Sequence, residues 1–264
     1  MSTLSTSTGA LSTGTTRLHS ALITVSAICV VIFVINYFYP SQPYIIAVQA
    51  ATLAYILILF SSRIAMSAAK VETPHVPAAG ESLNKNEKNI ADVNQNATSR
   101  EVIESVINQE EQNFSAHQHL LGILYGTLGV IVGSALLSGY YVEDKNWLVF
   151  AFYMSTSMCL MYRARNYVDR DAHIVLLWSA LITAFAYTIG LAVSDPYGNL
   201  PQIGAMIAAT FVSVLVGSLW ALGQRTIKAP TTRRWFELLE FAMYAAPVVW
   251  LGLLMDAYMK ARNR

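Results

Sequence analysis

The stretch from Phe236 to Tyr258, FELLEFAMYAAPVVWLGLLMDAY, decides the fold. It opens with the acids Glu237 and Glu240, continues as an apolar run, and closes with Asp256. A helix of about 20 residues, rising about 1.5 Å per residue, crosses the roughly 30 Å hydrocarbon core of a bilayer. No polar stripe runs along this stretch, as it would along a helix of a water-soluble fold. The stretch therefore predicts a helix that spans a membrane.

The rest of the chain has the same character. Of its 264 residues, 55% are hydrophobic and only 12% are charged, whereas soluble domains carry about 25% charged residues. The mean hydropathy is +0.44, and the apolar residues fall into separate blocks, so we predict an all-α integral membrane protein with seven transmembrane helices. The predicted spans are Ala21–Tyr39, Tyr44–Phe60, Leu120–Tyr141, Trp147–Tyr162, Ile174–Val193, Ile203–Leu222 and Leu238–Tyr258.

Proline and polar segments divide the chain into four parts. Pro40 and Pro43 bracket a very short turn between the first two spans, which should therefore form a hairpin. A polar segment follows, in which a capping box from Thr98 to Glu101 starts a short amphipathic helix. That helix either packs on the rim of the bundle or docks a partner. The predicted parts are a flexible Ser/Thr-rich tail (1–18), a transmembrane hairpin (19–62), a polar inside loop (63–118) and a five-helix transmembrane bundle (119–264).

Basic residues predict the orientation in the membrane. The loops on one side, PSQP, VEDKN and SDPYGNLP, contain one Lys and no Arg. By the positive-inside rule the N-terminus is inside and the C-terminus outside, although Lys260, Arg262 and Arg264 run against it. No basic run suggests binding to nucleic acid. The cations of the other side are Arg17, Arg63, Lys70, Arg163, Arg165, Arg170, Arg225, Lys228, Arg233 and Arg234.

The spans lack the side chains of several membrane chemistries. No histidine lies at membrane depth, so the chain alone cannot hold haem or copper in the bilayer core. No lysine or acid lies mid-span, which argues against a retinal Schiff base and against a self-sufficient ion pump. Cys29 and Cys159 lie in different spans and form no metal or disulfide motif. We therefore predict no catalytic residue, no metal site and no cofactor bound by this chain.

The second half of the chain contains a recognisable set of residues. They are the run from Val149 to Asn199, Gly217-Ser218 and, in the last span, Phe236-Glu237, VVWL at Val248 to Leu251 and Tyr258. This set resembles cytochrome c oxidase subunit III. Asp169-Arg170 also stands where that family has an acidic turn between its fourth and fifth helices. That family has about this length and seven helices, a hairpin of two followed by a bundle of five.

Several positions depart from the pattern of that family. Its third helix carries a buried glutamate, where this chain has Gly129. Its sixth helix has two histidines, where this chain has Thr210 and Ser213. Its last helix has a His and an Asp, replaced here by Tyr244 and Pro247. The resemblance therefore implies a divergent member.

The resemblance implies a non-catalytic subunit of a haem-copper terminal oxidase, a proton-translocating oxidoreductase complex of the aerobic respiratory chain. The membrane would be the bacterial cytoplasmic or the mitochondrial inner membrane. The partners would be subunits I and II, which carry the haem and copper, and the chain would support subunit I stability and proton uptake. Phospholipid would bind in the cleft between hairpin and bundle, on Arg63, Arg225 and Lys228. Alternatively, these cations reflect nothing more than the positive-inside bias.

Two other classes stay open. A small-solute transporter or channel should show inverted repeats or broken helices with Gly or Pro at paired positions. Pro247 is the one mid-span proline, and no such repeat is visible. The other class is a structural subunit of another membrane complex, with residues 61–119 as its docking element.

Overall fold

The computed structural model is entirely α-helical in the part of the chain it describes. The described residues are 3–70, 99–142, 146–165, 167, 169–194, 200–223 and 230–255. They contain seven helices: α1 (Thr3–Phe38), α2 (Pro43–Ala68), α4 (Ser99–Tyr141), α5 (Asn146–Ala164), α6 (Arg170–Ser194), α7 (Leu200–Gly223) and α8 (Pro230–Leu254).

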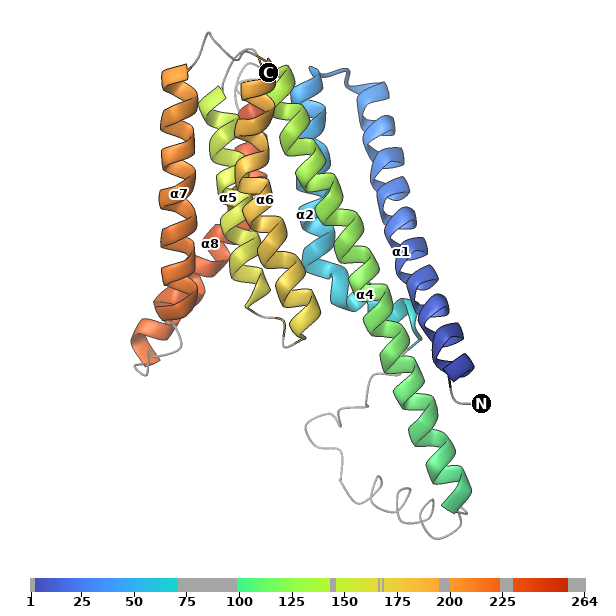
Figure 1. Ribbon diagram of the computed structural model, residues 1–264. Coiled ribbons are helices and arrows are strands. Elements are labelled where there is room, and N and C mark those ends of the chain that lie inside the picture. Colours follow the sequence, from blue (N-terminus) through green and yellow to red (C-terminus); the bar gives the residue numbers. More distant parts are fainter. Residues whose placement is uncertain are drawn as a thin grey trace.

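The helices stand side by side and alternate in direction (Figure 1). Helix α1 starts at the lower end in that view, and α8 finishes at the upper end. The lower half of α4 extends well beyond the other helices. Four stretches are long and apolar enough to cross a membrane: Gly14–Phe38, Pro43–Ala68, Gln112–Tyr141 and Arg170–Ser194. The chain is therefore a multi-pass membrane protein.

Each predicted span coincides with a helix, but two helices begin much earlier than predicted. Helix α1 starts at Thr3, so most of the predicted flexible tail (1–18) is helical. Helix α4 starts at Ser99, so the predicted amphipathic helix and the third span form one helix. The reason is that extending an existing helix adds one hydrogen bond per residue fixed, whereas starting a new one requires an unfavourable nucleus. The early part of the predicted loop, residues 71–98, lies outside the described residues.

Helix α4 lies at the centre of the packing. It packs most extensively against α2 and then against α6 and α1. Because α2 lies directly on α4, the first two helices are not a layer separate from the rest. Apolar side chains of this core include Ile58, Leu121 and Leu176, all fully buried. Helices α7 and α8 pack mainly against α5, on the far side from α1.

A group of buried hydroxyl groups links α4, α5 and α6. The Ser138 hydroxyl lies 2.8 Å from the Tyr153 hydroxyl, and the rings of Tyr153 and Tyr187 stack with centroids 5.9 Å apart. Tyr187 donates to the carbonyl of Asn146 at 3.0 Å. A polar group buried in hydrocarbon is costly unless it is hydrogen-bonded. These contacts therefore fix the register of α4, α5 and α6 against each other.

Candidate functional site

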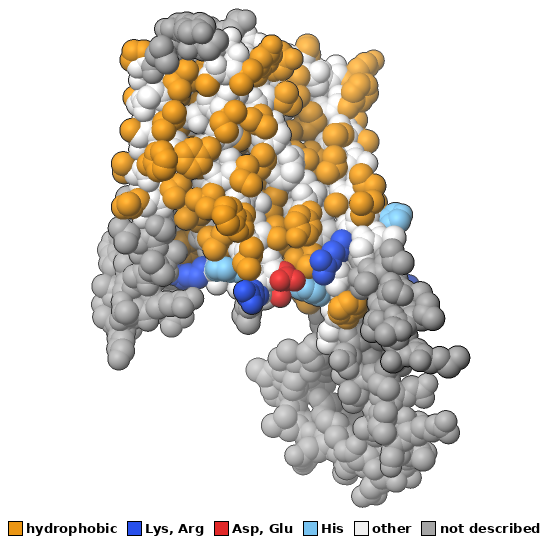
Figure 2. Space-filling model, viewed as in Figure 1, with side chains coloured by type: hydrophobic (Ala, Val, Ile, Leu, Met, Phe, Trp, Pro, Cys, Tyr) orange, Lys and Arg blue, Asp and Glu red, His pale blue; other side chains and the backbone are white. Residues whose placement is uncertain are grey.

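Charged and imidazole side chains gather along one edge of the apolar surface. Figure 2 shows Lys, Arg, acidic and His side chains along the lower edge of the hydrophobic face. We call these side chains, together with the Ser, Gln and Tyr side chains that contact them, the polar belt. Its members in the described part of the chain are Arg17, Ser20, Ser61, Arg63, His117, Gln118, His119, Arg163, Tyr167, Asp169 and His173. The belt marks the level at which the helices leave the apolar layer.

Helix α1 is attached to α4 within the belt. The Ser20 hydroxyl lies 2.7 Å from Nδ1 of His119, and the Arg17 guanidinium donates to the side-chain oxygen of Gln118. The backbones approach closely here, since a Cβ on Gly122 would meet the Arg17 carbonyl oxygen at 2.5 Å. The two helices are therefore joined by polar contacts and by a small-residue crossing.

Asp169 joins α4 to the start of α6. Its Oδ2 accepts a hydrogen bond from the Ala172 backbone N–H at 3.0 Å, which caps α6. The same oxygen lies 3.7 Å from Nδ1 of His117 on α4. His173 Nδ1 lies 2.8 Å from the Ala164 carbonyl oxygen, which closes the turn between α5 and α6. These contacts hold the end of α5, the start of α6 and the middle of α4 at one level.

Arg163 joins α5 to α2. Its Nη2 donates to the Leu59 carbonyl oxygen at 3.2 Å, and its guanidinium lies 5.7 Å from the centre of the Tyr167 ring. The Tyr167 hydroxyl lies 2.9 Å from the Ser61 hydroxyl. Nε of Arg163 is buried and has no hydrogen-bond partner among the described residues. The segment Leu59–Ser61 of α2 is thereby fixed at the level of the belt.

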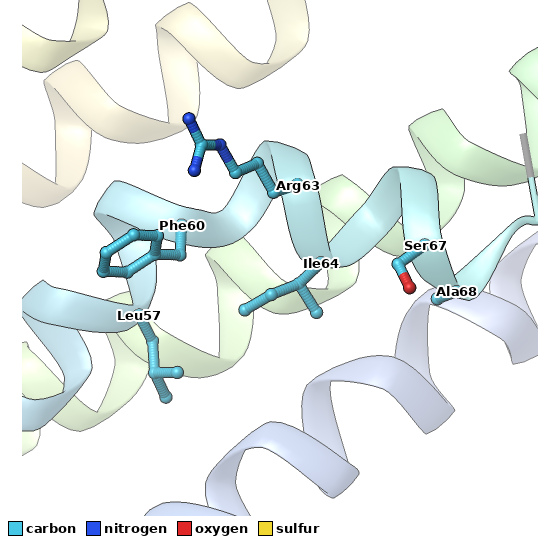
Figure 3. Close-up of a pocket in the computed structure, with 6 residues that line it drawn as sticks. All are labelled: Leu57, Phe60, Arg63, Ile64, Ser67 and Ala68. Carbon is cyan, nitrogen blue, oxygen red and sulfur yellow. The ribbon is translucent and has the colours of Figure 1, made fainter. Parts of the chain in front are cut away.

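An open groove of about 640 Å³ runs along the last turns of α2. Figure 3 shows Arg63 on one side of the groove face, Leu57 and Ile64 on the other, and Phe60 between them. Arg63 and Ile64 are exposed, and Phe60 is 49% exposed. Among the described residues, no acidic side chain lines the groove. The described lining is Leu57, Phe60, Arg63, Ile64, Ser67 and Ala68.

The structure separates the three cations predicted to bind lipid. Arg63 lies in the groove, at the level of the belt. Arg225 and Lys228 lie outside the described residues, between α7 and α8. Sequence reasoning did not identify the contacts of Arg163 and Asp169, because they join residues from different helices. The sequence signal that could have indicated these contacts was the position of both residues near helix ends, among other polar residues.

The belt has the chemistry of a structural element. In the part of the chain that the structure describes, no three His, Cys, Asp or Glu side chains lie close enough together to hold a metal ion. Three imidazoles, those of His117, His119 and His173, each contact a neighbouring helix or turn, and His19 contacts the Thr15 carbonyl oxygen of its own helix. Thr210, at one of the two positions of the expected histidines, is buried and donates to the Met206 carbonyl oxygen at 2.8 Å. The arrangement can align helices and receive anions at Arg63.

The fold and the belt define a multi-pass helical membrane protein whose polar groups serve mainly to join helices. Within that class, the chain belongs to the family of EccD-like transmembrane domains, whose model matches residues 2–264. A chain in the structure of protomer 1 of the ESX-3 core complex is similar in fold, with a TM-score of 0.62 and 16% identity. The match covers 91% of this chain and 51% of that chain. No curated protein matches the sequence.

The family match corrects the resemblance to cytochrome c oxidase subunit III, which was wrong. The matching positions, such as Phe236-Glu237 and Val248–Leu251, are residues common at any membrane helix. The departures at Gly129, Thr210 and Tyr244 were more informative than the matches. Ionisable residues inside a membrane usually serve a function, and this chain lacks the Glu and His residues that the oxidase family has at these positions. The family match also contradicts what the resemblance implied. It overturns the oxidase function, the assignment to an enzyme complex, subunits I and II as partners, and the respiratory setting. Of the readings left open, a structural subunit of another membrane complex agrees with the family.

Proposed function

We propose that this chain is a non-catalytic transmembrane component of the core complex of an ESX (type VII) secretion system, in a bacterial cytoplasmic membrane. The family match over residues 2–264 carries the proposal. The fold supports it, since the similar solved chain comes from an ESX-3 core complex. This chain spans about half of the length of that chain. Its role is to form part of the membrane wall of the assembly and to bind the other core subunits.

The outer surface of the helices fits a role in assembly. Large apolar side chains are exposed on helices at both sides of the bundle, among them Phe33 of α1 (72%), Trp178 of α6 (63%) and Phe211 of α7 (61%). In a membrane such surface faces either lipid or another transmembrane helix. The described helices therefore offer ample apolar surface for neighbouring subunits.

The proposal includes seven membrane crossings with the N-terminus of α1 inside. Helices α5, α7 and α8 would cross beside the four long apolar spans, because they alternate in direction with them (Figure 1). The belt cations Arg17, Arg63 and Arg163 share the end where α1 starts, which the positive-inside rule places in the cytoplasm.

Affinity purification tests the proposal. The full chain, tagged and expressed from its own locus, is extracted in mild detergent, and the co-purifying proteins are identified by mass spectrometry. We expect the other subunits of an ESX core complex in a large assembly, and no haem in the reduced-minus-oxidised spectrum. A stand-alone homo-oligomer would overturn the proposal and favour a transporter. Stoichiometric haem-copper subunits would overturn it as well.

A further inference from the structure

The groove on α2 combines a cation with an apolar face. Leu57, Phe60 and Ile64 are spaced three and four residues apart, so they share one side of the helix. Arg63 lies beside them, and the small residues Ser67 and Ala68 complete the end of the groove. Along α2 the lining thus changes from the apolar Leu57 and Phe60 to a level that Arg63 and Ile64 share, and then to small side chains. A phospholipid has the same order of chemistry, from acyl chain to phosphate to headgroup.

Arg63 has no described partner for its charge. No hydrogen bond or ion pair joins it to any residue in the part of the chain that the structure describes, and the groove contains no acid. Arg163, by contrast, is engaged with Leu59 and Tyr167. A guanidinium forms strong, often bidentate, hydrogen bonds with phosphate oxygens. Arg63 is therefore the group in this groove that would attract a phosphate.

The belt places Arg63 at the depth of the lipid headgroups. Arg163 fixes the Leu59 carbonyl, one turn before Arg63, and Tyr167 fixes Ser61, two residues before it. Both contacts are made by residues of the polar belt. At that depth a phosphodiester meets Arg63 directly, while an acyl chain reaches Phe60 and Leu57 deeper in the membrane (Figure 3).

We propose that this groove is a binding site for an anionic phospholipid, with its phosphodiester on the Arg63 guanidinium and one acyl chain along Leu57, Phe60 and Ile64. The site goes beyond the proposed function and does not depend on it, since it needs only the chain and a bilayer. It covers an apolar helix end that no described segment of the chain covers. Arg225 and Lys228, predicted from the sequence as further lipid ligands, are not needed for it.

Native mass spectrometry of the purified full chain tests the site. Phosphatidylglycerol is added to the detergent-solubilised protein, and the bound lipid is measured against concentration. We expect Arg63→Gln to lower the affinity about five-fold, the factor for one cation near an anionic membrane surface. Arg63→Lys should keep part of the affinity, and Phe60→Ala should lower it through lost acyl-chain contact. Equal lipid affinity in the wild type and Arg63→Gln would overturn the proposal.

Lys70 offers a matched control. It lies two residues beyond the end of the same helix and is exposed, but it does not line the groove, so Lys70→Gln removes the same charge nearby. We expect Lys70→Gln to bind lipid as the wild type does. An equal loss in both variants would show general charge attraction and would refute the groove. Inorganic phosphate is the second probe: displacement of the lipid by millimolar phosphate would identify a free-anion site and overturn the phospholipid assignment. Failure of the complex to co-purify would leave these measurements unaffected.

Discussion

Two glycines set the distance between α4 and α6. A Cβ on Gly139 would collide with the Tyr187 carbonyl oxygen and meet the Leu191 nitrogen at 2.8 Å. A Cβ on Gly190 would likewise collide with the Leu136 carbonyl oxygen. The obstacles are backbone atoms on the opposite helix, so a side chain cannot rotate away from them. The crossing therefore requires glycine on both helices.

Gly139→Ala should lower the stability of the protein in detergent by about 1–3 kcal/mol, because overpacking forces the two backbones apart. Thermal unfolding followed by circular dichroism measures the effect. Gly129→Ala is the control on the same helix, since a Cβ there meets nothing within 4 Å. That control should be neutral or slightly stabilising, because alanine favours helix more than glycine does. Similar losses for both variants would contradict the close crossing.

Asp169 combines a helix cap with a charge beside His117, and two substitutions separate these roles. Asp169→Ala removes the acceptor of the Ala172 N–H and should cost about 0.5–2 kcal/mol. Asp169→Asn keeps an acceptor and should retain most of the stability. The thermal unfolding midpoints of the two variants provide the comparison. If Asn is as harmful as Ala, the contact with His117 outweighs the cap.

Among the elements, α4 differs most from its prediction. Hydropathy finds the part of a helix that lies in the bilayer, and Leu120 marks that start well. The helix itself begins at Ser99 and passes through the belt residues His117 to His119 without a break. A hydropathy window detects the residues that lie in lipid, so it does not detect the part of a helix that continues into water. The same reasoning explains why α1 begins at Thr3 rather than near Ala21.

Hydrogen exchange in nanodiscs tests the continuity of α4. Amides of residues 112–119 should exchange as slowly as those of a regular helix, because each is bonded within one unbroken helix. A separate amphipathic helix joined by a hinge would show fast exchange in that window. The amides of α2 from Thr52 to Ile58, which are buried in the core, serve as the slow reference.

For the molecule as a whole, the arrangement of helices makes the orientation testable. Ser41 lies in the turn between α1 and α2, and Lys70 lies just beyond the other end of α2. In a Cys29→Ala background, Ser41→Cys should react with a membrane-impermeant maleimide in intact cells. Lys70→Cys should react only after the cells are opened. Cys159 is buried and should not react with the maleimide. The opposite labelling pattern would invert the proposed topology.

The sequence was sufficient for the class of fold and insufficient for the family. Apolar blocks such as Tyr44–Phe60 predict helices because backbone polar groups in lipid must be satisfied within a helix. The same requirement makes unrelated membrane helices look alike, so Val248–Leu251 could not discriminate between families. The site was predictable in part: Arg63 follows from charge at a helix end, whereas the contact between Arg163 and Leu59 joins residues far apart in the chain.

The attachment of α1 to α4 has a consequence for biosynthesis. Ser20 of α1 finds its partner His119 only after about half of α4 has been made, 99 residues later in the chain. At about 5–20 residues per second, the ribosome needs roughly 5–20 s to close that gap. During this interval α1 and α2 stand in the bilayer without the helix that packs between them. Until α4 arrives, the Ser20 hydroxyl lacks its imidazole partner and must bond to water or lipid headgroups at the level of the belt, whereas the Thr24 hydroxyl already donates to the Ser20 carbonyl oxygen within α1.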